Sequence, residues 1–274
     1  MKITALIENT ASSPELLSEH GLSFYAETGN HRLMFDFGLS DGYITNARAL
    51  GIDLKTVDAA FLSHGHHDHG GGLAAFLNLN SKANVYAHKA AFSPYFAKRP
   101  TGETKYIGLD SDLPNDPRII LTDDVTAVDP ALTLFAGVTG RELFSDTNSV
   151  LMEMRGDELF EDRFLHEQNL FIDEGGRTVL LAGCAHNGII NILERCKNVI
   201  GKLPDVCFGG FHLSNPTAGT SLPQEKIEAL AERLHDYPTI FYTCHCTGLS
   251  PYAALKEKLG DKVRYISGGD TIDV

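Results

Sequence analysis

The chain has 274 residues, of which 43% are hydrophobic and 22% are charged. These values are those of an ordinary globular protein, and no apolar run approaches the roughly 18 residues of a membrane span, so collagen-like, coiled-coil, disordered and transmembrane classes are excluded. The 23 basic and 36 acidic residues give a formal net charge of −13, which disfavours nucleic acid as a partner. A strand is predicted from residue 2 with no signal segment before it, so we expect a cytoplasmic protein.

The first third of the chain reads as strands followed by a helix. We expect strands at 2–8, 22–28 and 32–36, with a hairpin turn at 28–31 between the last two. A buried strand is predicted at 57–62, and the glycines at 70–72 open the next helix. Strands and helices alternate in this way along the whole chain, which predicts an α/β layered fold.

Residues 89–147 have the weakest periodicity and several prolines, so we interpret them as an insertion or lid on a single domain spanning 1–274. The segment also holds a concentrated positive patch beside Phe92 and Phe96. Its cations are Lys98, Arg99 and Lys105. They would suit a small, anionic, ring-bearing substrate, although a solvated basic loop is an equally good interpretation.

The last part of the chain continues the alternation. A hairpin is predicted from strands at 169–172 and 178–182, followed by an amphipathic helix at 188–200 that buries Cys196. Further strands are expected at 206–209 and 239–243. One helix should begin near Pro223, and a last helix should have Ser250 as its N-cap and end at Gly260.

Histidines gather where the predicted strand 57–62 ends. The segment from His64 to His69 reads His-Gly-His-His-Asp-His. In an extended chain alternate residues point the same way, so His64, His66 and Asp68 should converge, with His69 added from the adjoining turn. Imidazole and carboxylate are usual ligands of zinc, iron and manganese, and this density of ligands favours two adjacent ions.

This His-x-His-x-Asp-His motif after a buried strand resembles the signature of the metallo-β-lactamase superfamily. The resemblance covers essentially the whole chain and implies an αβ/βα four-layer sandwich. The family's early Asp-x-Gly motif is similar to Asp36-Phe37-Gly38 here. Asp36 is therefore expected to orient a ligand histidine through a hydrogen bond.

The resemblance also implies later metal ligands. His245 follows the strand 239–243, and Cys184 stands where the family has an aspartate. A thiolate favours zinc or iron over magnesium, so we expect two divalent ions, zinc first, with iron or manganese as alternatives. Either His166 or His186 completes the first ion's ligands, and we favour His186.

The segments around Cys184, His212 and His245 together resemble a narrower branch that includes an archaeal dihydropterin ribofuranosyl-aminobenzene phosphate synthase. His212 follows a strand and a glycine pair, so it should reach the same end of the sandwich. The sequence is equally compatible with a catalytic role and with a structural role for His212.

The resemblance implies a dinuclear hydrolase that attacks an ester, phosphoester or amide with a metal-bound hydroxide, with Asp68 both binding metal and orienting the nucleophile. Three alternatives use the same residues. They are a dihydropterin-type synthase, an iron-dependent redox protein and a metal-dependent binding module. A homo-oligomer is compatible with the sequence, which does not specify one.

Overall fold

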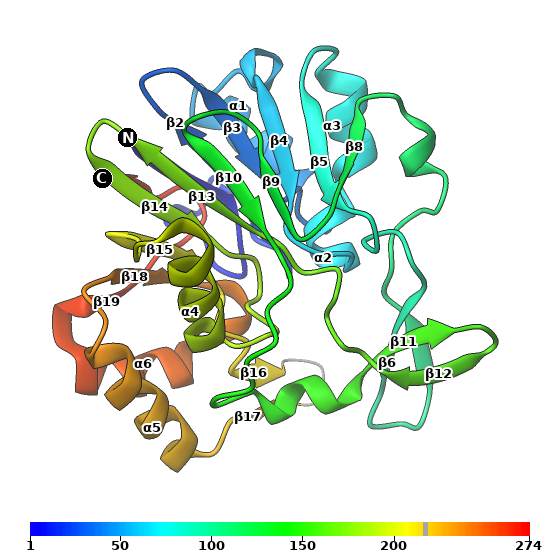
Figure 1. Ribbon diagram of the computed structural model, residues 1–274. Helices are drawn as coiled ribbons and strands as arrows, with labels where there is room; N and C mark the ends of the chain where they lie inside the picture. Colours follow the sequence, from blue (N-terminus) through cyan, green and yellow to red (C-terminus); the bar gives the residue numbers. More distant parts are fainter. Residues whose placement is uncertain (216–218) are drawn as a thin grey trace.

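The computed structural model describes residues 1–215 and 219–274. Two seven-stranded sheets pack face to face, as Figure 1 shows. In spatial order the first sheet contains β20 (Thr271–Asp273), β1 (Lys2–Ile7), β2 (Ser23–Glu27), β3 (Arg32–Phe35), β4 (Ala59–Leu62), β5 (Asn84–His88) and β8 (Ile119–Thr122). The second contains β19 (Val263–Tyr265), β18 (Ile240–Thr243), β15 (Val206–Gly209), β14 (Arg177–Leu181), β13 (Asn169–Glu174), β10 (Leu132–Phe135) and β9 (Val125–Ala127).

Helices cover the outer face of each sheet. The first sheet carries α1 (Gly42–Ala49) and α3 (Leu73–Leu79), and the second carries α4 (Ile189–Ile200), α5 (Gln224–His235) and α6 (Leu249–Leu259). Apolar side chains of both sheets meet between them, and the rings of Phe24 and Phe208 lie 6.1 Å apart across this interface. The expected αβ/βα four-layer sandwich is therefore confirmed.

The strand directions determine where the loops collect. β3, β4, β5 and β8 run parallel in the first sheet, as do β14, β15, β18 and β19 in the second. Loops that follow parallel strands leave from one edge of a sheet. The loops after β4, β14, β15 and β18 carry the predicted site residues, and the structure brings them to one end of the sandwich.

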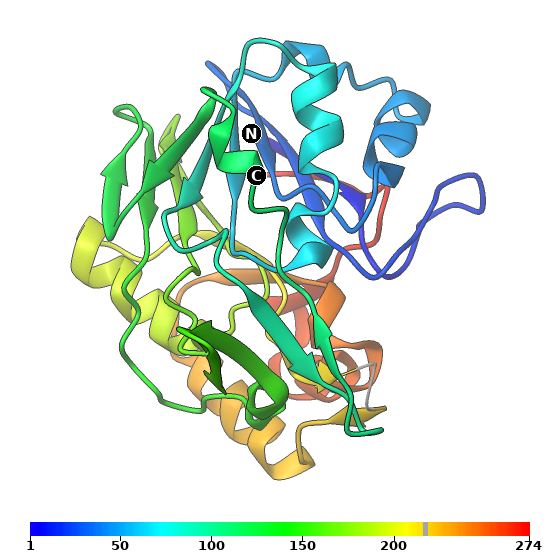
Figure 2. The ribbon, with the colours of Figure 1, turned by 90° about the vertical axis from the view of Figure 1, so that its right-hand side faces the viewer.

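The segment expected to be one lid is divided in the structure. Only β6 (Tyr95–Lys98) and β7 (Thr104–Tyr106) leave the sandwich, where they join β11 (Leu151–Arg155) and β12 (Glu158–Glu161) in a four-stranded sheet, visible below the main sheets in Figure 2. β8, β9 and β10 extend the two main sheets instead. Of the five strands within residues 89–147, three therefore belong to the main sheets and two to the smaller sheet.

Short elements complete the chain. In the part of the chain that the structure describes, they are α2 (His67–Gly70), the two-stranded ribbon of β16 (Ser214–Asn215) and β17 (Thr220–Ser221), and five short 3₁₀ turns at Leu54–Thr56, Leu113–Asn115, Asp146–Val150, His245–Thr247 and Gly260–Lys262. Within the described ranges, no helix combines the length and the apolar character needed to cross a membrane.

Two local predictions were wrong. The last helix has Gly248 and not Ser250 as its N-cap, because the backbone there takes a φ of 77°, which glycine adopts without strain. The histidine motif is not extended throughout, since Asp68 and His69 lie in the short helix α2. The motif side chains therefore converge through a strand-to-helix turn and not through strand alternation.

Candidate metal centre

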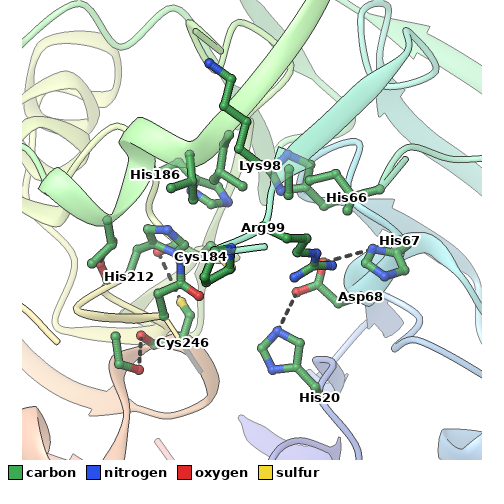
Figure 3. A pocket seen from close by; sticks show the side chains of 18 residues that line it. His20, His66, His67, Asp68, Lys98, Arg99, Cys184, His186, His212 and Cys246 are labelled. Carbon is green, nitrogen blue, oxygen red and sulfur yellow. Dashed lines mark hydrogen bonds and ion pairs between the residues drawn. The ribbon is translucent and has the colours of Figure 1, made fainter. Parts of the chain in front are cut away.

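A cavity of about 260 Å³ opens at the end of the sandwich where the two sheets meet (Figure 3). Its floor includes His66, Asp68, Cys184 and His186, and its sides come from β6, from the loop before β11 and from the loop after β15. The predicted site residues from both halves of the chain thus surround one space.

The turn after β4 is compact because Gly65 admits no side chain. A Cβ at Gly65 would lie 2.1 Å from the carbonyl oxygen of Ala91. The turn leaves His64 completely buried, with Nδ1 2.8 Å from Ser63 Oγ. Its Nε2 is buried and has no hydrogen-bond partner. Burial first, and neighbouring histidines second, hold the pKa of His64 well below its usual value, so this imidazole is neutral and able to bind metal.

His69 is held between a carboxylate and two candidate ligands. Its Nδ1 lies 2.7 Å from Asp36 Oδ2, while Nε2 lies 3.1 Å from Cys184 Sγ and 3.2 Å from His245 Nε2. Burial opposes the charged imidazolium, but Asp36 and then Asp68 outweigh it and raise the pKa of His69 to about 9. Without metal His69 is therefore protonated, and a metal ion would displace that proton.

Asp36 is completely buried at the end of β3, with a φ of 63°. Besides the contact with His69, its two carboxylate oxygens accept hydrogen bonds of 2.7 Å from the amide and the hydroxyl of Ser63. The residue thus ties the metal-binding turn to the neighbouring strand.

Asp68 lies among three imidazoles. Its Oδ2 is 3.3 Å from His245 Nε2, 3.5 Å from His20 Nε2 and 3.7 Å from His69 Nε2. Burial alone would raise the pKa of Asp68, but the nearby imidazoles, His69 foremost, bring it well below its usual value. The carboxylate is therefore ionised and placed to bind a cation.

His245 comes from the loop after β18 and has a backbone φ of 52°. Its amide donates to Glu8 Oε2 at 3.1 Å, and its Nδ1 lies 3.0 Å from Asn9 Oδ1. Asn9, which follows β1, therefore fixes the ring with Nε2 directed at Asp68 and His69.

His186 is fixed in a comparable way by groups from distant loops. Its amide donates to Glu167 Oε1 at 2.6 Å, and its Nδ1 lies 2.9 Å from Asn148 Oδ1. Its Nε2 is buried without a hydrogen-bond partner. The ring centroid is 4.8 Å from that of His64, so the two histidines present ring nitrogens to the same space.

His166, the other candidate for the first ion, is completely buried. Its Nδ1 accepts a hydrogen bond of 2.9 Å from the amide of Gly65, and its Nε2 lies 3.0 Å from Asp162 Oδ2. Both ring nitrogens are therefore engaged, in contrast to His186. The same Asp162 oxygen lies 3.6 Å from His66 Nε2.

The donor atoms gather into overlapping groups in which all atoms lie within 4.8 Å of one another. One group contains Asp68, His69, Cys184 and His245, and another contains His64, Cys184 and His186. His66 lies with His64 and Asp68 in a third. Imidazole nitrogens without partners, one carboxylate and one thiol form a set that suits zinc or iron.

His212 lies beside this set, with its ring centroid 4.2 Å from that of His186. Its backbone φ is 48°, and its carbonyl accepts hydrogen bonds from Ser145 Oγ at 2.7 Å and Thr147 Oγ1 at 2.9 Å. Non-glycine residues in this conformation cluster at functional sites, where surrounding contacts hold them in place. His212 lines the cavity, as expected from the sequence.

The predicted cationic residues separate into two groups. Lys98 and Arg99 line the cavity, where Ala97, Ile107 and Leu151 supply apolar surface. Lys105 is exposed on β7 and is not among the lining residues.

Several functional neighbours were missed from the sequence. His20 and His67 were not among the predicted site residues, yet both line the cavity. Asn148 and Glu167, which fix His186, and Asp162, which lies beside His66, were not predicted, because each lies far along the chain from that partner and belongs to no motif. Only His67, inside the histidine motif, carried a sequence signal.

Residues 19–231 match the family model described as "Metallo-beta-lactamase superfamily". A solved structure with 26% sequence identity, Tm1679, described as a metal-dependent hydrolase of the β-lactamase superfamily, superposes with a TM-score of 0.82 over 100% of this chain and 99% of that one. These matches confirm the resemblance predicted from the histidine motif.

Two proteins of Methanocaldococcus jannaschii are similar over nearly their full lengths. One, an uncharacterised protein, is 28% identical over 93% of this chain and 94% of its own. The other is 7,8-dihydropterin-6-methyl-4-(β-D-ribofuranosyl)-aminobenzene-5′-phosphate synthase, 27% identical over 99% of this chain and 96% of its own. The similarity to the synthase branch expected from the segments around Cys184, His212 and His245 is thus also confirmed.

Proposed function

The chain belongs to the metallo-β-lactamase superfamily, and we propose that it is a hydrolase that uses two divalent metal ions to cleave a small anionic substrate. The observation that carries this proposal is the pair of buried Nε2 atoms of His64 and His186, which face one space without a hydrogen-bond partner. Leaving buried nitrogens unpaired costs about 1–3 kcal/mol each, so a ligand is expected to pair with them.

The donor groups suggest how two ions would share the residues. His64, His66 and His186 would hold the first ion, and Asp68, His69 and His245 the second. Cys184 belongs to both principal groups and would be available as a ligand to either ion. The two ions would supply Lewis-acid chemistry, which activates a water molecule and polarises the substrate oxygen under attack.

The protein's own contribution is to fix the ligands in advance. Ser63, Asn148 and Asn9 each lie within 3.0 Å of a ring Nδ1, on His64, His186 and His245 respectively, so each ring presents Nε2. Asp36 does the same for His69 with a full negative charge. Such partners set the tautomer and the orientation of metal-binding histidines.

The charges of the cavity lining favour an anionic substrate. Asp68, a proposed ligand, is the one carboxylate among the described residues that line the cavity, while Lys98 and Arg99 bring positive charge to it. They would hold a phosphate or carboxylate, and the apolar side formed by Ile107 and Leu151 would hold a non-polar portion.

His212 would act on the substrate itself. It lies next to His186 at the cavity wall, and its backbone is fixed by two hydroxyl groups. We assign it the role of donating a hydrogen bond or a proton to the group that leaves.

The test is metal content measured together with turnover. Untagged protein purified without oxygen is analysed for metals and assayed on phosphomonoester, phosphodiester and thioester substrates, before and after chelation and reloading. About two zinc ions per chain, with turnover lost on chelation and restored on reloading, supports the proposal. His64→Ala should lose metal, whereas His235→Ala, exposed at the end of α5, should not. Full turnover by the stripped protein would refute it.

The synthase relative favours a second candidate, condensation of a dihydropterin with a ribofuranosyl-aminobenzene phosphate in the same cavity. The similarity over nearly the whole of both chains supports this alternative. A synthase requires both substrates for any product, whereas a hydrolase requires one substrate and water. Product formation with each substrate alone and with both therefore separates the two activities.

A further inference from the structure

Cys184 lies in the loop after β14 and Cys246 in the loop after β18. The two residues lie side by side although 61 residues separate them in the chain. Their sulfur atoms are within 4.8 Å of one another, and Cys246 Sγ is 3.5 Å from the carbonyl oxygen of Cys184. We propose that a peroxide entering the cavity converts this pair into a reversible disulfide, which removes Cys184 from the metal ligands. The consequence for metal binding rests on the proposed function, whereas disulfide formation does not.

The surroundings make room for the second sulfur. A Cβ at Gly210 would lie 2.3 Å from Cys246 Sγ, so only glycine leaves this space open. The carbonyl of Cys246 accepts hydrogen bonds from the amide of Leu213 at 3.1 Å and from Ser214 Oγ at 3.2 Å. These contacts hold the backbone of Cys246 in place, with its sulfur toward Cys184.

Access distinguishes this pair from the other thiols. All five cysteines lie in the described part of the chain and are free, but only Cys184 and Cys246 line the cavity (Figure 3). Cys196, Cys207 and Cys244 are completely buried in hydrophobic clusters. A small polar oxidant in the cavity would therefore meet the pair and not the remaining three.

The chemistry balances with a hydroperoxide as oxidant. One sulfur attacks the peroxide oxygen and becomes a sulfenic acid, while the peroxide leaves as an alcohol, or as water from hydrogen peroxide. The second sulfur then displaces water from the sulfenic acid to form the disulfide. Two thiols and one hydroperoxide thus give one disulfide, one alcohol and one water. A thiol reductant converts the disulfide back into two thiols.

Disulfide formation would affect metal binding because of the position of Cys184. This residue belongs to both principal donor groups, one with His69 and His245 and the other with His64 and His186. A sulfur committed to a disulfide is no longer a thiolate ligand. Oxidation of the pair would therefore weaken the binding of both ions at once.

The experiment treats the metal-loaded protein with hydrogen peroxide and follows two readouts, the intact mass with peptide mapping and the metal released to a chromogenic chelator. We expect the protein to lose the mass of two hydrogen atoms, a Cys184–Cys246 peptide link, and release of metal that thiol reductant and added zinc reverse. Cys246→Ser and Cys246→Ala should form no link and retain metal at least tenfold longer. Cys207→Ala is the control, because it removes a buried thiol of β15 that does not line the cavity, and this variant should behave like the parent protein.

Oxygen addition without a link, a link to any other cysteine, or equally fast metal release from both Cys246 variants would overturn the proposal. Mapping the unsubstituted protein keeps the test valid should a variant fold poorly. If the reduced protein binds no metal yet forms the link, the dinuclear function fails while the thiol pair stands.

Discussion

Asp36 Oδ2 and His69 Nδ1 lie 2.7 Å apart, and this contact joins the end of β3 to the short helix α2. Replacing Asp36 by Asn preserves the size of the side chain but removes its charge. We expect roughly 10–100-fold weaker metal binding, since such partners orient the ligand and raise its basicity. Competition with a chelator of known affinity measures the change. Asp41→Asn, at an exposed position without a capping hydrogen bond, is the control and should have no effect.

His186 and His166 should respond differently to alanine substitution. His186→Ala should remove about one ion per chain, because its unpartnered Nε2 is a proposed ligand. His166→Ala should keep both ions but lower the free energy of unfolding by about 3 kcal/mol, because it leaves Asp162 without its closest imidazole. Elemental analysis and denaturant unfolding measure the two effects. If His166→Ala loses an ion and His186→Ala does not, then His166 is the metal ligand and His186 is not.

The positively charged side chains of the cavity should affect substrate binding and not metal binding. Lys98→Ala and Arg99→Ala should each raise KM for an anionic substrate roughly 10–100-fold, since one charge-assisted hydrogen bond contributes about 1.5–3 kcal/mol. Metal content should not change. Lys105→Ala provides a matched control, because Lys105 lies on the neighbouring strand outside the cavity lining. Equal effects of all three substitutions would indicate general attraction by the loop and not a binding subsite.

The metal-free protein should be most stable near pH 6.5. Burial foremost lowers the pKa of His66 to about 4, so the unfolded chain takes up a proton first and stability is lost as pH falls from 6.5 toward 4. Although burial opposes it, Asp36 and Asp68 raise the pKa of His69 to about 9, so its stabilisation is present below 6.5 and is lost as pH rises toward 9. Denaturant unfolding across this range measures both slopes. Asp36→Asn should flatten the alkaline one, and an unchanged alkaline slope would contradict the assignment.

The sequence predicted the residues of the site better than the contacts that fix them. His64, His66, Asp68 and His69 form a local motif, and its position after a buried strand is visible without a structure. The partners of these residues are not local. Asp162, which follows β12, lies 3.6 Å from Nε2 of His66, which follows β4, and such pairing depends on tertiary packing that periodicity does not encode.

Local chain geometry explains the remaining differences. Strands β13 and β14 lie where the hairpin signal predicted them, and helix α4 lies where the apolar stripe did, because both signals are local in the chain. The strands β8, β9 and β10 were missed because each has only three or four residues, and β8 and β9 are also partly exposed edge strands. His20 lies in a loop without regular structure, so no pattern could place it 3.5 Å from Asp68.

The donor atoms come from the two faces of the sandwich. His69 follows the first sheet and Cys184 the second, 115 residues apart in the chain, yet they meet at 3.1 Å. Any ion held between them would act as a cross-link that closes a long loop of polypeptide, so its binding energy would also resist separation of the two sheets. Removal of such an ion would then lower the free energy of unfolding as well as abolish the proposed activity.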